Sequence, residues 1–169
     1  MADLPPIFAF ALNISPRVMT LILSMLPISE LRGAIPYAIW VGNIGWKEAY
    51  IIAVIGNFIP VIPLLFFMER ASEWLRKYPL GDRFFTWFFN RTRKKGKLIE
   101  RFEAIGLTMF VAIPLPVTGA WTGCAAAIIF GVPRKFAIPC IFLGVMIAGC
   151  IVTLASLGVI SFWGIEGKG

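Results

Sequence analysis

One acid and one base lie two positions apart inside an otherwise apolar stretch of the chain. Glu30 and Arg32 fall within the segment 27–36, between the apolar runs 18–26 and 37–44. Charged side chains at membrane depth are costly, so they tend to face a cavity or a partner and to mark function. A carboxyl group in low-dielectric surroundings favours its protonated form, so Glu30 could carry a proton. Arg32 stays charged and could hold a phosphate or carboxylate bidentately.

The same two side chains could instead form a fixed ion pair that locks the protein together. Residues two apart on a helix point to different sides, so Glu30 and Arg32 need not pair with each other. We therefore expect these two residues to titrate and to bind, and we keep the structural ion pair as the alternative.

A second polar break occupies the segment 113–123. Thr118 and Thr122 supply hydroxyl groups there, and Trp121 could stack on a substrate or simply pack. A helix that begins near Thr118 would aim its free N–H groups into the same cavity as Glu30. Prolines and glycines bound both breaks: Pro27, Gly33 and Pro36 at the first, and Pro114, Pro116, Gly119 and Gly123 at the second. The spacing of the last two glycines more often serves close packing than chemistry.

The composition places this chemistry in a membrane. Of 169 residues, 59% are hydrophobic and 15% charged, and the mean hydropathy is +0.83. Soluble domains have about 45–50% apolar and 25% charged residues, so we predict a single integral α-helical membrane domain. Histidine is absent, and Asp3 and Asp82 lie outside the apolar spans. The usual nucleophile–base and metal-ligand sets are therefore missing, and we expect no enzyme, metal or cofactor.

Each polar break lies between apolar arms that are too short to cross a bilayer. A ten-residue helix is roughly 15 Å long, whereas the hydrocarbon core is about 30 Å thick. We therefore predict two re-entrant helical hairpins, each followed by a full span. The arms are 17–26 with 31–44 and 105–113 with 118–130, and the spans are 49–68 and 136–165. The alternative is a four-span protein without re-entrance.

The two units follow the same order of elements. A shift of 87 residues places Pro27 on Pro114, which supports an internal repeat. Asn57 lies near the middle of the first span, where an interhelical hydrogen bond and a substrate contact are both plausible roles. We predict an interfacial segment at 1–14, repeat 1 at 15–68, a basic loop at 69–103 and repeat 2 at 104–165.

The distribution of positive charge predicts the orientation in the plasma membrane. Ten of the sixteen basic residues lie between Arg70 and Arg101, so the loop 69–103 is expected in the cytoplasm and both termini outside. The two repeats then have opposite topology, as in secondary transporters with broken helices. In a chain this apolar, the basic residues do not indicate nucleic acid. The run Arg91–Lys97 is instead expected to attract anionic lipid headgroups.

The two tips and the basic segment between them resemble the small multidrug export protein family. The resemblance covers nearly the whole chain, and it rests on Glu-Leu-Arg-Gly-Ala-Ile-Pro at 30–36 and on the tip 114–123. That family is similar in plan to the wider DedA group, whose members have paired re-entrant hairpins. DedA-type proteins have functional acids and arginines around the hairpins, and Glu30 and Arg32 alone match that role here. The second tip has neither, which departs from the DedA pattern.

The resemblance implies transport that depends on the proton-motive force, with drugs or polyprenyl phosphates as substrates. We therefore expect proton-coupled export or flipping of an amphipathic or lipid-phosphate substrate. The alternative is a non-transporting scaffold or lipid-organising protein, in which Glu30 and Arg32 are a structural pair. Two hairpins and two spans make a thin bundle, so we also expect a homodimer.

Overall fold

The computed structural model describes residues 14–75, 96–115 and 118–162. Every regular element in these ranges is a helix. Of the predicted interfacial segment 1–14, only Ile14 is among the described residues. Pro116 and the basic residues at 91–95 also lie outside the described ranges. The expectations for those residues stay predictions.

The first hairpin begins where the sequence predicts. Helix α2 spans Pro16–Met25, and the Ser15 hydroxyl accepts a hydrogen bond from the Val18 N–H at 3.5 Å, as an N-cap does. Proline occupies the first helical position, where a missing N–H costs nothing. At the tip, the Ser29 hydroxyl donates to the Leu23 carbonyl and closes the turn.

The return arm of this hairpin differs from the expected plain helix. Helix α3 spans Glu30–Pro36 and continues directly into the π-helical turn η1, Tyr37–Val41. Pro36, which bounds the first polar break in the sequence, therefore does not end the helix. The helix accommodates this proline by widening to π geometry directly after it, which compensates for the hydrogen bond that proline cannot donate.

Two helices are long and apolar enough to cross a membrane, among the described residues. The first, Trp46–Ala71, is broken at Ile59–Pro60 into α4 (Trp46–Phe58) and α5 (Val61–Leu75), as Pro60 predicts. The second lies in α9, which spans Arg134–Phe162. The two apolar stretches measure roughly 39 and 37 Å at 1.5 Å per residue, which exceeds the hydrocarbon thickness.

The second hairpin consists of α7 (Gly96–Ala112) and α8 (Ala120–Ile129). Helix α7 begins well before the expected arm at 105, within the segment predicted to be loop. The residues Lys-Leu-Ile-Glu-Arg-Phe-Glu that follow Gly96 are mostly good helix formers, so the helix extends through them. Helix α8 matches the expected second arm closely.

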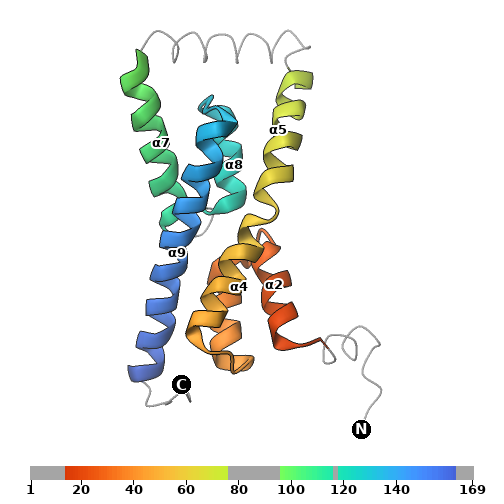
Figure 1. Cartoon of the computed structure of the whole chain (residues 1–169), viewed down its shortest axis with the longest axis vertical. Coiled ribbons are helices and arrows are strands. Elements are labelled where there is room, and N and C mark those ends of the chain that lie inside the picture. The colour runs from red at the N-terminus through yellow and green to blue at the C-terminus, as the bar shows by residue number, and fades with distance from the viewer. Residues whose placement is uncertain (1–13, 76–95, 116–117, 163–169) are drawn as a thin grey trace.

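The helices form two halves that meet at mid-height. Figure 1 shows α2 and α4 in the lower half, α5, α7 and α8 in the upper half, and α9 running along both. Helix α2 packs on α4, α8 packs on α5, and α9 packs on α3, α4 and α7. The shared core includes Ile35, Leu65 and Ile141, each at most 1% exposed. The two hairpin tips are thereby brought to the middle of the molecule.

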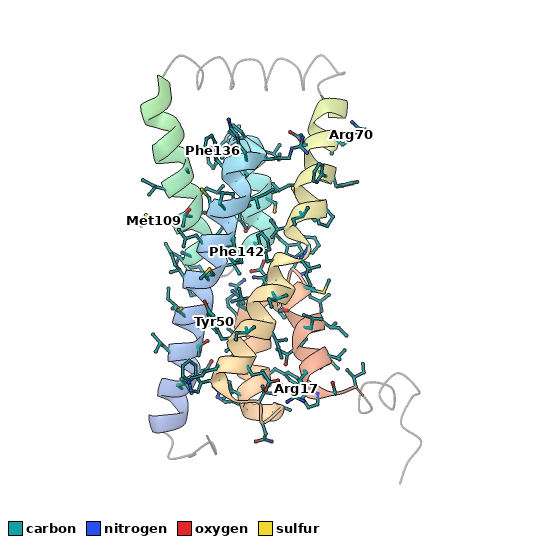
Figure 2. All side chains as sticks on the ribbon, in the orientation of Figure 1. Arg17, Tyr50, Arg70, Met109, Phe136 and Phe142 are labelled. Carbon is teal, nitrogen blue, oxygen red and sulfur yellow. The ribbon has the colours of Figure 1, made fainter. Side chains whose placement is uncertain are left out.

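The outer surface is apolar between two charged ends. Only 33% and 44% of the most apolar windows of the two long helices are buried, so most of their side chains face outward. Figure 2 shows Arg17 at the lower end and Arg70 at the upper end. A soluble protein rarely exposes an apolar surface this extensive, so the pattern fits a protein surrounded by lipid.

A close approach of α2 to α4 depends on Gly56. A Cβ atom there would lie 2.0 Å from the Ser24 hydroxyl and 2.9 Å from the Leu21 carbonyl oxygen. The serine side chain can rotate, but the carbonyl belongs to the backbone of α2. We expect Gly56→Ala to push the helices apart and to destabilise the fold by about 1–3 kcal/mol.

Thermal unfolding in detergent tests this expectation. Gly106→Ala is the matched control, because Gly106 also lies inside a helix but has nothing within 4 Å of an added Cβ. The control should unfold at or slightly above the wild-type temperature, since alanine is the better helix former. Equal midpoints for the two variants would contradict the close α2–α4 contact.

Candidate functional site

The two hairpin tips contact each other directly at the centre of the molecule. Helix α3 starts at Glu30, and α8 starts at Ala120 directly after the second tip. The Trp121 indole N–H donates to the Met25 carbonyl oxygen at 3.1 Å, which ties the start of α8 to the end of α2. Residues about 90 positions apart in sequence therefore share one site.

Glu30 is the charged side chain that this site buries. It is 5% exposed, and no other charged residue is buried among the side chains that the structure describes. Its Oε1 accepts from the Trp121 backbone N–H at 3.5 Å, at the limit of a hydrogen bond. The carboxyl group thus lies at the N-terminus of α8, where the helix dipole and the free N–H groups favour an anion.

The backbone is unusual on both sides of this contact. Glu30 has a φ of 43°, and Gly119 has a φ of 150° with ψ −164°. The Gly119 conformation is open almost only to glycine, and left-handed backbone at a glutamate costs of order 1 kcal/mol or more. A Cβ on Gly119 would lie 1.8 Å from Glu30 Oε2. The carboxyl group therefore fills the space that a glycine leaves open.

Arg32 reaches the second tip as well. Its Nη2 donates to the Thr118 carbonyl oxygen at 3.4 Å, and its side chain is half-buried. The described ion pairs do not include one between Arg32 and Glu30. Each of these charged side chains instead contacts the opposite hairpin. Within the described ranges the guanidinium group donates the one hydrogen bond to Thr118, which leaves most of its donors available there.

The hydroxyl groups of the second tip are used locally. Thr118 Oγ1 donates to the Ile113 carbonyl oxygen at 2.6 Å and accepts from the Leu115 N–H at 3.0 Å. Thr122 Oγ1 donates to the Gly119 carbonyl oxygen at 3.4 Å. Threonine hydroxyls close turns readily in this way, so Thr118 contributes to the site mainly through its carbonyl.

Asn57 is buried at the same place without a hydrogen-bond partner. Its side chain is fully buried, and neither Nδ2 nor Oδ1 has a partner within the described part of the chain. A buried amide left unsatisfied costs roughly 1–3 kcal/mol, so it calls for an explanation such as a bound molecule. The sequence already marks this residue by its position in the middle of a span.

A cavity joins these groups. It is narrow in this structure, with room for about one water molecule. Its polar lining comes from four residues of three segments: Glu30, Arg32, Asn57 and Thr118. Its apolar wall comes from α7 and α9, through Val111, Val145 and Ala148. The cavity also touches Pro114 and Gly119 of the second tip.

The other tip residues serve the packing of the hairpins. Pro27 is exposed at the first turn, and an added Cβ on Gly33 would lie 2.8 Å from Ser29 Cβ. A Cβ on Gly123 would lie 2.5 Å from Val111 Cγ2, so this glycine lets α8 approach α7. Sequence reasoning missed Ser29, which closes the first turn, because a serine near a proline is common in any loop.

Ion pairs mark the two ends of the molecule rather than its centre. At the lower end, Arg17 Nε lies 2.5 Å from Glu48 Oε1, which joins α2 to α4. On the other half, Arg134 Nε lies 2.7 Å from Glu69 Oε2, and the Arg134 guanidinium covers the Phe66 ring at 4.4 Å. The central site therefore lies between one ion pair near each end of the molecule.

Comparison with known proteins gives one match. A family model described as "Putative small multi-drug export protein" matches residues 30–151, which is more than half of the chain. The match begins at Glu30 and includes Arg32, Asn57 and the whole second tip. No curated protein and no solved structure matches the chain. The chain belongs to the small multi-drug export protein family.

Proposed function

We propose that the protein is a proton-coupled transporter that exports or flips an amphipathic or lipid-phosphate substrate such as a polyprenyl phosphate. One observation carries the proposal: the buried carboxyl of Glu30 and the guanidinium of Arg32 line one cavity where the tips of the two hairpins meet. Broken helices that meet near the midplane around charged groups are the plan of secondary transporters.

The proposed architecture is a pair of inverted repeats in the plasma membrane. Helices α2 and α8 have ten residues each, too few to span, and they lie in opposite halves of the molecule (Figure 1). Each hairpin would enter from its own face, with the basic segment in the cytoplasm and both termini outside. The basic run would attract anionic headgroups, and a homodimer would thicken the bundle.

Each charged group has a separate role in this proposal. Glu30 carries the proton, because burial makes its neutral form accessible. Arg32 and the N–H groups of α8 hold the anionic headgroup. A scaffold in which Glu30 and Arg32 form a structural pair is less well supported, because both side chains contact the second tip instead.

Reconstitution in liposomes tests the proposal. Under an imposed proton gradient, we expect the protein to redistribute a polyprenyl phosphate between leaflets at a rate that collapses when an ionophore removes the gradient. An organic cation offered in the same liposomes should not accumulate. Movement of neither substrate above the rate of protein-free liposomes would contradict a transport function.

A further inference from the structure

The carboxyl group of Glu30 occupies the place that suits an anionic ligand. The N-terminus of α8, with the Trp121 N–H directed at Glu30 Oε1, offers backbone donors and a positive dipole end. Gly119 has no side chain of its own, so the space beside these donors is open to the Glu30 carboxyl group. A carboxylate oxygen and a phosphate oxygen accept hydrogen bonds from the same backbone N–H groups, so the two cannot be bound there at the same time.

A second, independent observation points to a ligand here. The fully buried Asn57 amide lines the same cavity, and both of its polar atoms lack partners in the described part of the chain. Its Nδ2 could donate to an anion bound in this cavity. The Glu30 carboxylate accepts from the N-terminus of α8 and leaves this amide without a partner. Arg32 lines the cavity too and has further donors than the one it gives to Thr118.

We infer that deprotonated Glu30 is a built-in competitor of a phosphate-monoester headgroup, and that protonation of Glu30 frees the Gly119–Trp121 N-terminus, which then binds the headgroup together with Arg32 and Asn57. This inference rests on the proposed function and adds the rule by which proton binding and headgroup binding are coupled. Protonation removes the negative charge that the N-terminus of α8 favours, so the neutral carboxyl group competes less well for the Trp121 N–H. Proton and anion are then bound together and cross in the same direction, so an inward proton gradient would flip the headgroup towards the cytoplasm rather than export it.

The neighbours of Glu30 leave few other groups to titrate. Among the described residues, Arg32 is the charged group near it, and Cys124 on α8 is close enough to interact with it electrostatically. The Cys124 thiol donates to the Val61 carbonyl oxygen at 3.9 Å. Helix α4 presents uncharged Asn57, α9 presents Val145 and Ala148, and the one ionisable residue of α2 pairs with Glu48.

Binding of dodecyl phosphate to the full chain in an uncharged detergent tests the competition. For the wild type, we expect the affinity to fall about tenfold per pH unit above the titration of Glu30. Glu30→Gln should hold the affinity of the acidic limit and keep only the smaller pH effect of the probe's own second ionisation. Glu30→Ala is a second neutral variant, and size-exclusion chromatography confirms that each variant is folded. Inorganic phosphate as a competitor distinguishes a free phosphate from a lipid headgroup as the ligand.

Asn57→Leu separates the binding role from the titration. It should weaken dodecyl phosphate binding at every pH and leave the pH slope unchanged. The competition is wrong if Glu30→Gln and wild type show the same pH dependence, even where proton-driven transport is observed. Conversely, pH-dependent binding that Glu30→Gln removes would uphold the competition even if liposomes showed no proton-driven transport, so the two proposals fail separately.

Discussion

Replacing Glu30 with glutamine is expected to abolish proton-driven accumulation of substrate while the protein still folds. Glutamine has nearly the same shape and no charge, and the Trp121 indole still donates to the Met25 carbonyl oxygen, so the contact between the tips can persist. Glutamine cannot gain or lose a proton, so the imposed proton gradient can no longer drive substrate movement through protonation of residue 30. Liposomes with the variant should accumulate substrate at the protein-free rate, and exchange of substrate without a gradient should continue.

Glu48→Gln provides the matched control for this experiment. Glu48 is a glutamate in the first turn of α4, but it is exposed and pairs with Arg17 at the end of the molecule. An exposed ion pair contributes only about 0–1 kcal/mol, so the control should fold and transport like the wild type. Normal gradient-driven transport by Glu30→Gln would remove Glu30 from the coupling mechanism.

A charge exchange distinguishes transport from a scaffold role. In a scaffold that needs only a structural pair, Glu30→Arg combined with Arg32→Glu would be tolerated. The site is not symmetrical in this way, because position 30 lies at the positive N-terminus of α8 and position 32 contacts the Thr118 carbonyl oxygen. The exchanged charges would each face a group of their own sign.

The local elements of the fold could be predicted because their signals lie within a few residues. Ser15 caps the helix that begins at Pro16, and Pro60 separates α4 from α5. The apolar length of α9 and the short arm at α8 were also readable from the sequence. The family match independently supports the resemblance that these tips carry.

The rest depended on contacts that no local pattern contains. Pro36 continues into a π-helical turn because the following segment packs in the core, a tertiary effect that outweighs the local preference for a break. The Thr118 hydroxyl donates to the Ile113 carbonyl oxygen of its own turn and not to a group in the cavity. The contact between Gly119 and the Glu30 carboxyl group involves residues far apart in sequence. The predicted repeat suggested that the two tips meet, but the sequence contains no signal for which of their atoms are in contact.

Replacing Gly119 with alanine is expected to eliminate both the carboxyl contact and the anion site. The alanine Cβ would occupy a position 1.8 Å from Glu30 Oε2, and the φ of 150° is one that alanine avoids. The backbone strain alone amounts to about 1–3 kcal/mol, so the start of α8 must shift or the fold loses that stability. Gradient-driven transport should fall to background, and dodecyl phosphate binding should weaken at acidic as well as alkaline pH.

Gly45→Ala is the control that isolates the geometry of Gly119. Both glycines are the N-cap residue of a helix, but Gly45 has an ordinary φ of −57° and nothing within 4 Å of an added Cβ. Loss of a glycine N-cap to alanine is a small effect of about 1 kcal/mol or less. A variant at Gly119 that binds and transports as well as the Gly45 variant would show that the N-terminus of α8 is not where the anion and the Glu30 carboxyl compete.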